Sequence, residues 1–235
     1  LPRIFPAFPS QKEFDIYAIM NPAKEVGGDF YDFFMVDKDH LAAVVADVSG
    51  KGVPAALFMV IAKTLIKDHA QHGTSPDVVF TEVNRLLCET NDEGMFVTAW
   101  MGILELSTGH LAYVNAGHNP PLLRRADGKY DYLRTRSGLV LAGMEETRYR
   151  SCSLELSPGD ALFIYTDGVT EATDASGQLY GEARLAAVLN ANRDCAPEPL
   201  LSAVRADVEA FVGQAPQFDD ITALSLCYYG QAPSL

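Results

Sequence analysis

The stretch Leu41-Ala-Ala-Val-Val-Ala-Asp-Val-Ser-Gly-Lys-Gly-Val-Pro54 decides the fold class of this chain. Its first six residues are apolar without a break, which is typical of a short strand buried on both faces. Asp47 follows the strand directly, a segment with two glycines comes next, and helical spacing begins after Pro54. A buried strand that ends in a carboxylate and leads into a helix predicts a helix-covered sheet with polar chemistry at the strand end.

Strand patterns continue on both sides of this stretch. Apolar runs rich in β-branched and aromatic residues, separated by turn residues, predict strands at Phe14–Met20, Phe30–Val36, Leu41–Ala46, Phe96–Leu106, His110–Val114, Pro121–Arg125, Leu154–Leu156, Ala161–Thr166 and Ile221–Tyr228. Ser107-Thr108-Gly109 is expected to form a hairpin turn between two of these strands.

Helical spacing occurs in two places, and each is long enough for a pair of helices. Leu57, Ile61 and Leu65 form one apolar stripe, and Ser75-Pro76 starts the next helix. The spacing returns over residues 185–189 and 200–212. Because single strands and helices do not alternate along the chain, a doubly wound parallel sheet is disfavoured. We expect one α+β domain in which helices cover antiparallel sheets.

The composition excludes several classes of protein. Hydrophobic residues make up 48% of the 235 residues, so the chain can bury a core and is not a disordered tail. Lys and Arg number 18 against 31 Asp and Glu, which gives a net charge of −13. A protein that binds nucleic acid or an anionic membrane surface needs basic faces. Neither kind of partner is therefore expected.

The cysteines and the chain ends indicate a cytoplasmic domain cut from a longer protein. Cys88, Cys152, Cys195 and Cys227 are widely spaced and read as reduced thiols. There is no secretory leader, and no apolar run reaches the roughly 18 residues of a membrane span. The prolines of residues 1–12 favour extended backbone, so we expect a linker there from an upstream regulatory region, followed by a domain at 13–230. A membrane anchor upstream would be invisible in this sequence.

Acidic residues stand at the ends of the predicted strands. An ionised carboxylate beside a buried strand is costly unless a positive group compensates it. No matching arginines lie nearby in sequence, and a hard divalent cation would satisfy several carboxylates together; all-oxygen ligation favours Mg²⁺ or Mn²⁺ over zinc. The acidic residues at these positions are Asp29, Asp32, Asp47, Asp167, Asp219 and Asp220.

Each aspartate alone also fits an ordinary turn or cap. The set is more informative, because most of its motifs pair the aspartate with a glycine that admits close backbone approach. Two divalent ions about 4 Å apart are an arrangement used for phosphate hydrolysis, with a metal-activated water as the nucleophile. That chemistry needs no serine, cysteine or histidine nucleophile, and the sequence offers no convincing one.

Five motifs, taken together, resemble those of the bacterial PPM (PP2C-like) serine/threonine phosphatases, and most closely the SpoIIE/RsbU-type branch. They occur in the family's order: Glu25-Val-Gly-Gly-Asp-Phe-Tyr-Asp32, Ala46-Asp-Val-Ser-Gly-Lys-Gly52, Asn115-Ala-Gly-His-Asn-Pro-Pro121, Tyr165-Thr-Asp-Gly-Val-Thr-Glu171 and Phe218-Asp-Asp-Ile-Thr222. The resemblance implies an α-β-β-α sandwich, that is, two antiparallel sheets flanked by helix pairs. It also implies two Mn²⁺ or Mg²⁺ ions at one end of the sandwich.

The resemblance assigns roles to individual residues. Asp47 would bridge the two ions and the carbonyl of Val48 would bind one of them, while Asp29, Asp167 and Asp219 complete the ligand set. Lys24 occupies the position of an arginine that holds phosphate in eukaryotic relatives; an ordinary solvated lysine is the alternative. Possible supporting residues around the ligands are Asp32, Gly168 and Asp220.

Other polar residues near these motifs have simpler interpretations. The Ser49–Gly52 segment lacks the Walker spacing and is expected to let the chain pass close to the metals. His118 is expected to form a structural hydrogen bond. His69 and His72 are interpreted as polar residues at a helix end rather than as ligands.

The expected function is hydrolysis of phosphoserine or phosphothreonine in a protein. By resemblance, the substrate is a small regulator, typically a STAS-domain anti-sigma-factor antagonist, in bacterial partner-switching signalling. An upstream sensory region would act through the helix pair at 53–90, and homodimerisation is left open. Two alternatives are another two-metal phosphoester hydrolase and a non-catalytic module with the same fold.

Overall fold

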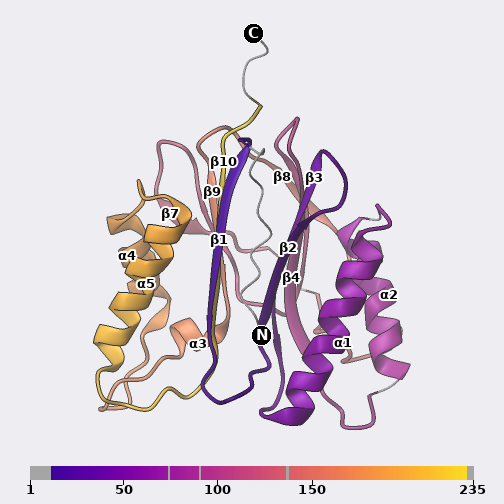
Figure 1. Ribbon diagram of the computed structural model, residues 1–235, viewed down its shortest axis with the longest axis horizontal. Coiled ribbons are helices and arrows are strands. Elements are labelled where there is room, and N and C mark those ends of the chain that lie inside the picture. The colour runs from indigo at the N-terminus through magenta and orange to yellow at the C-terminus, as the bar shows by residue number, and fades with distance from the viewer. Residues whose placement is uncertain (1–11, 74, 90, 136–137, 232–235) are drawn as a thin grey trace.

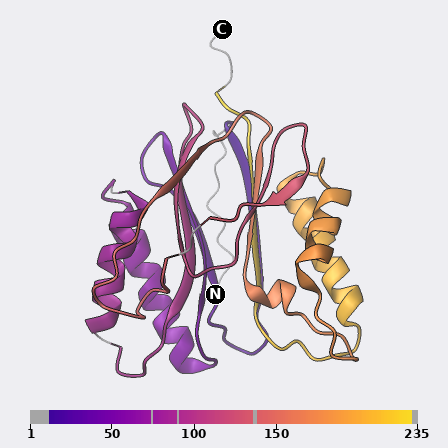
Figure 2. The ribbon, with the colours of Figure 1, turned by 180° about the vertical axis from the view of Figure 1, so that it is seen from behind.

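Two antiparallel sheets face each other, and a pair of helices covers the outer face of each (Figure 1). The computed structural model describes residues 12–73, 75–89, 91–135 and 138–231. The four layers are also seen from behind in Figure 2. The α-β-β-α sandwich expected from the sequence is therefore confirmed. The predicted linker at 1–12 lies almost entirely outside the described residues.

Each sheet has five strands, and every strand pairing is antiparallel. One sheet has the order β1-β10-β9-β6-β7, with bounds Phe14–Asn21, Ile221–Tyr228, Ala161–Tyr165, Leu122–Arg124 and Tyr130–Tyr132. The other has the order β2-β3-β4-β5-β8, with bounds Phe30–Met35, His40–Val48, Val97–Glu105, His110–Ala116 and Cys152–Glu155.

The helices divide between the two outer layers. On the β2–β8 sheet lie α1 (Val53–Ala70) and α2 (Pro76–Glu89). On the other sheet lie α4 (Gly181–Ala191) and α5 (Pro197–Val212). The short α3 (Asp167–Thr170) directly follows β9. Within the described ranges, no helix combines the length and apolar character that crossing a bilayer would need.

The apolar run Leu41–Ala46 is buried on both sides of its sheet. In β3, Ala42, Val44 and Ala46 pack under α1 and α2. The alternating residues Leu41, Ala43 and Val45 pack between the two sheets. A third core fills the space under α4 and α5. β3 is therefore fixed from both faces, and the backbone that carries Asp47 at its end has little freedom to shift.

The helix predicted from the stripe Leu57, Ile61 and Leu65 is confirmed as α1, but only Leu65 of the three packs against the core. Leu57 is 62% exposed and Ile61 45% exposed, whereas Ala55, Phe58, Met59, Ala62 and Ile66 face the sheet. The small alanines let the helix lie close to β3, and the larger aliphatic residues remain outside. β7 and α3 were not predicted; both are too short to show a period.

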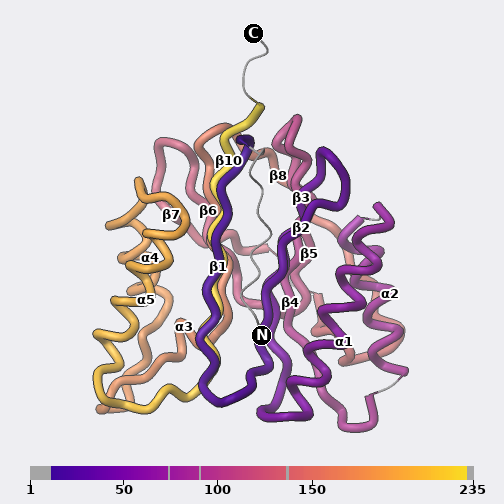
Figure 3. The backbone as a smooth tube through the Cα atoms, in the orientation of Figure 1, coloured from indigo at the N-terminus to yellow at the C-terminus, as the bar shows by residue number. Residues whose placement is uncertain are grey.

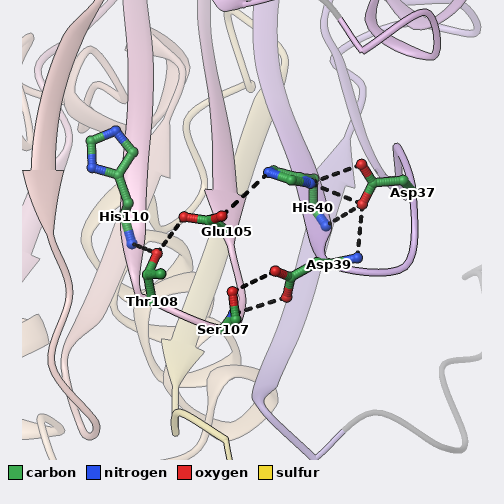
Figure 4. A network of polar contacts seen from close by, with 7 residues as sticks. All are labelled: Asp37, Asp39, His40, Glu105, Ser107, Thr108 and His110. Carbon is green, nitrogen blue, oxygen red and sulfur yellow. Dashed lines mark hydrogen bonds and ion pairs between the residues drawn. The ribbon is translucent and has the colours of Figure 1, made fainter.

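The two ends of the sandwich differ in their polar residues. At the end of the β2–β3 and β4–β5 turns, surface side chains form a network (Figure 4). Asp37 contacts His40, and Asp39 accepts hydrogen bonds from the backbone N–H and hydroxyl of Ser107. These contacts join two hairpins at the surface. The carboxylates named by the sequence motifs lie at the other end.

Candidate metal and phosphate site

Four chain segments carry aspartates to one end of the sandwich, the lower end in Figures 1 and 3. They are the β1–β2 loop, the end of β3, the start of α3 and the segment before β10, which enters with two aspartates in sequence. The register explains the meeting, because Asn21 pairs with Ile221 and Phe30 pairs with Ala46. Hydrogen bonding thus brings residues that are nearly 200 positions apart into one cluster.

Asp29 and Asp220 form the inner half of this cluster, and protein donors hold them. Asp29 is only 3% exposed, and the hydroxyl of Thr166 donates to its Oδ2 at 2.7 Å. Asp220 accepts the N–H of Ala23 at 2.7 Å and, more weakly, the N–H of Asp29 at 3.4 Å. Asp220 therefore ties the β1–β2 loop to the start of β10.

Close packing around the inner half requires glycine at three positions. A Cβ on Gly27 would lie 2.0 Å from Asp220 Oδ2, and one on Gly168 would lie 1.9 Å from the Asp220 carbonyl oxygen. A Cβ on Gly28 would lie 2.8 Å from the carbonyl oxygen of Val48. Real Cβ atoms do not approach oxygen this closely without a shift of backbone or side chain. The glycines of the motifs are thus explained by contact.

Asp47, Asp167 and Asp219 form the outer half, where like charges approach one another. Burial raises the pKa of Asp47 to about 7, and the charge of Asp167 adds to the effect, while a hydrogen bond with Asp29 opposes it. Burial raises the pKa of Asp167 as well, followed by the charges of Glu171 and Asp219. For Asp29, burial and then Asp47 raise the pKa well above its usual range. A compensating cation would relieve all three.

Lys51 contacts the outer half. Its Nζ lies 3.1 Å from Asp219 Oδ2, donates to the carbonyl of Phe218 at 2.7 Å and stands 3.9 Å above the Phe218 ring centre. It also lowers the pKa of Asp167 somewhat, against the larger effects that raise it. The loop that begins α1 is thereby joined to the segment that carries Asp219.

A small hollow of about 10 Å³ lies among these groups. That volume is about the space of one water molecule or one ion. Its lining includes the carboxylates of Asp47, Asp219 and Asp220 and the side chains of Lys24 and Lys51. Lys24 itself is exposed in the β1–β2 loop.

The donors at this end suit a hard cation that keeps part of its water shell. Among the described residues that line the hollow, the acidic donors are the carboxylates of Asp47, Asp219 and Asp220, and no cysteine or histidine is present. Across the part of the chain that the structure describes, no group of three or more Asp, Glu, His or Cys side chains is placed so that it could hold a metal ion by itself. Mg²⁺ is commonly bound by one or two carboxylates while several waters complete its shell. The donor set therefore fits Mg²⁺ or Mn²⁺ bound in an open site.

Two further candidates lie apart from the hollow. Asp32 is on β2, and its Oδ2 lies 3.5 Å from Nζ of Lys67 on α1, so its ion pair joins strand to helix. His118 is buried: its backbone N–H donates to Asn115, and its Nδ1 lies 3.0 Å from the Thr98 hydroxyl. Burial lowers the pKa of His118 to about 4, so it is neutral, and the structural role expected for it is confirmed.

Sequence reasoning missed Thr166 and the contacts of Lys51. Thr166 directly precedes Asp167, and that adjacency was the available signal: a hydroxyl at a strand end can support a neighbouring carboxylate. Lys51 was interpreted only as part of a glycine-containing loop. Its partner Phe218 is 167 positions away, so no local pattern could have shown the contact.

Comparisons with known proteins agree with these observations. A family model described as stage II sporulation protein E (SpoIIE) matches residues 37–229. Protein IcfG of Synechocystis sp. (strain ATCC 27184 / PCC 6803 / Kazusa) is 30% identical over 94% of this chain. Phosphoserine phosphatase RsbU of Bacillus subtilis (strain 168) is 33% identical over 73% of it. The chain spans 39% of IcfG and 51% of RsbU, about half or less of these relatives' length.

A solved structure extends the match to the fold. The RsbU and RsbW domains of Rv1364c from Mycobacterium tuberculosis superpose with a TM-score of 0.79 at 28% identity. The match covers 94% of this chain and 62% of that one. The arrangement of sheets and helices is therefore shared along almost the whole sequence.

Proposed function

This chain belongs to the SpoIIE family, in the SpoIIE/RsbU branch of bacterial PPM phosphatases, and on that basis we propose that it is a metal-dependent phosphatase of phosphoserine and phosphothreonine in proteins. The observation that carries the proposal is the outer half of the aspartate cluster. In addition to burial, the charges of Asp167 and Asp219 raise the pKa of Asp47, and that of Asp219 raises the pKa of Asp167. Asp47 and Asp219 also line the small hollow. Such a cluster is suited to binding cations that in turn attract a phosphate.

Asp47, Asp167, Asp219 and the carbonyl of Val48 would hold Mn²⁺ or Mg²⁺, with Asp29 behind them. Bound there, two such ions would lower the pKa of a water and offset the charge on phosphate oxygens. The chain's own contribution is position: Thr166 fixes Asp29, and Asp220 fixes the β1–β2 loop. Gly28 leaves room for the Val48 carbonyl.

Lys51 is assigned to the substrate phosphate. An ammonium within 3.1 Å of Asp219 can exchange that contact for a phosphate oxygen once Asp219 is bound to a cation. Lys24 lines the same hollow and is the residue that the family resemblance assigns. Lys51 is preferred because its side chain is already directed at the cluster by Phe218.

The substrate is proposed to be a small phosphorylated regulator with a STAS domain, an anti-sigma-factor antagonist in partner switching. Two relatives support this choice. RsbU is called a phosphoserine phosphatase, and Rv1364c carries an RsbU domain and an RsbW domain in one structure. The reaction on such a substrate would release inorganic phosphate and a free serine.

Regulation is proposed to act through α1 and α2, on a signal from an upstream sensory region. α1 begins five residues after Val48, and its entry loop holds Asp219 through Lys51. The outward apolar face of α1 is available for a regulatory contact, since Val53, Leu57, Val60 and Ile61 are all exposed. A shift of α1 would thus move the cation-binding residues directly.

The test is phosphate release from a phosphoserine protein and from an aryl phosphate, with Mn²⁺ and with EDTA. The wild type is expected to need Mn²⁺, and Asp167→Ala should abolish release. Asp131→Ala is the matched control, because Asp131 is an exposed aspartate on β7, an edge strand of its sheet. Release that survives both EDTA and Asp167→Ala would reject the proposal. Cleavage of phosphodiesters but not of phosphoserine would favour the other two-metal hydrolase.

A further inference from the structure

A cavity of about 210 Å³ lies next to the aspartate cluster, and nothing in the proposed reaction uses it. It is bounded by α3, by the end of α5 and by the segment that leads into β10. Gly168 and Asp219 belong to both the cavity and the cluster. Whatever occupies this cavity therefore lies beside the position of the substrate phosphate.

The lining combines apolar walls with acidic groups. The apolar part comes from Ala172, Val208, Val212, Pro216 and Ile221. The ionisable side chains that line it are Glu171, Glu209 and Asp219, and the lining contains no lysine, arginine or histidine.

The two glutamates differ in whether they already have an ion-pair partner. Among the described residues, Glu171 is exposed and forms no ion pair. Glu209 pairs with Arg205 one turn away on α5, where both side chains are about half exposed. Exposed pairs of this kind contribute only about 0.2–1 kcal/mol, so a stronger partner can replace Arg205.

Size and chemistry together select the occupant. Pockets for small organic ligands usually enclose about 300–1,000 Å³, so 210 Å³ suits a single side chain better than a whole metabolite. Lysine and arginine bury their methylene stems on apolar surface while the charged end stays at a polar rim. Apolar walls with carboxylates at the edge match that pattern.

We propose that this cavity receives an arginine or lysine side chain of the phosphoprotein substrate, close in sequence to the phosphorylated residue. The inference rests on the proposed function, because the phosphate fixes the substrate at the neighbouring cluster. The cavity and the hollow share Asp219, so we place the basic residue within three positions of the phosphoserine, a reach of about 10 Å for an extended chain. The site would thus recognise a phosphate and a positive charge side by side.

The experiment uses alanine-based phosphoserine peptides with Arg, Leu or Glu at each of three positions on either side. With Mn²⁺ present, Arg at one position is expected to raise kcat/KM about tenfold over Ala, mainly through KM, and Glu to lower it. The preference should decrease as salt rises. A preference for Leu, or none at all, would overturn the inference.

Two variants separate this cavity from the cluster. Glu209→Gln should reduce the preference for Arg. Val212→Arg, which places a basic side chain in the cavity, should do the same. Hydrolysis of an aryl phosphate should stay unchanged in both, since it does not reach the cavity. An Arg preference that survives both variants would contradict the assignment.

Binding is measured separately from turnover, by fluorescence anisotropy with the same labelled peptides. This separates the inference from the proposed function. A chain that hydrolyses neither substrate but binds the Arg peptide about tenfold tighter would reject the phosphatase and support the cavity. A chain that hydrolyses the aryl phosphate and shows equal affinity for all peptides would do the reverse.

Discussion

The inner and outer halves of the aspartate cluster contain the same type of side chain, but the neighbours of these carboxylates differ. In the inner half, Asp29 and Asp220 receive protein donors from Thr166 and from the backbone of Ala23. In the outer half, burial and then neighbouring negative charges raise the pKa values of Asp47 and Asp167, and Lys51 contacts Asp219. Carboxylates that the protein satisfies hold the loops in place. In our proposal, the carboxylates that face like charge bind the cations, with Asp29 behind them.

The largest expected effect comes from the outer half. Asp47→Asn removes the carboxylate at the centre of the cluster, and turnover should fall by about 1,000-fold, equivalent to about 4 kcal/mol of transition-state stabilisation. Phosphate release under saturating Mn²⁺ measures it. A variant with a tenth or more of wild-type turnover would place the ions elsewhere.

The same residue should make the metal-free protein sensitive to pH. Asp47 has a pKa of about 7 in the fold against an ordinary value of 3.8. Between these values the folded state keeps a proton that the unfolded state releases, so stability falls as pH rises through this window, by up to about 4 kcal/mol, and is flat above it. Urea unfolding in EDTA at pH 5 and pH 8 tests this. Asp47→Asn should show a smaller difference between the two pH values.

Substitution at the inner half should act through the backbone. Gly168→Ala forces the Asp220 carbonyl to move, because the new Cβ would lie 1.9 Å from it, and should cost about 3 kcal/mol of stability and weaken Mn²⁺ binding. Gly128→Ala is the control, since a Cβ there meets only ordinary contacts at 3.5 Å or more. Equal melting temperatures for the two variants would show that the packing at Gly168 is unimportant.

Removing a supporting donor should have a smaller effect. Thr166→Val takes away the hydroxyl that donates to Asp29, and should cost about 1–3 kcal/mol of stability. Mn²⁺ affinity should weaken by roughly 10- to 100-fold, as is typical for residues behind a metal ligand. Thr64→Val on the exposed side of α1 is the control. An unchanged affinity in Thr166→Val would remove Asp29 from the ligand set.

The smallest effect is expected at the lysines. Lys51→Met should weaken inhibition by inorganic phosphate about tenfold, while Mn²⁺ binds no more weakly, because Asp219 loses a competing cation. Lys24→Met should change phosphate inhibition less. If the two variants behave in the opposite order, the phosphate position belongs to Lys24, as the family resemblance assigns it.

Much of the fold was predictable because its strands carry strong local patterns. Residues 221–228 were predicted to the residue, and β3 was recognised from its unbroken apolar run. The buried face of α1 was not, because Leu57, Ile61 and Leu65 have the spacing of a core stripe and only packing decides which face is inside. The face of α1 that packs on the sheet includes small alanines, while larger aliphatic residues stay exposed. Periodicity alone does not distinguish these two faces.

The candidate site was predictable residue by residue but not as an arrangement. The aspartates at strand ends identified the members of the cluster, and the adjacent glycines indicated that the backbone passes close to them. That Asp220 hydrogen-bonds Ala23, 197 positions away, depends on the pairing of β1 with β10 and has no local signal. The division of the cluster into two halves therefore required the structure. The metal-ligand roles of Asp29, Asp47, Asp167 and Asp219 stay predictions.

The central claim is that the outer half of the cluster binds the ions and the inner half supports it. Calorimetric titration of Mn²⁺ into the wild type, Asp167→Asn and Thr166→Val tests it most directly. We expect Asp167→Asn to lose at least one binding event and Thr166→Val to keep the wild-type number at weaker affinity. Full binding by Asp167→Asn, with the same affinity as the wild type, would contradict the account.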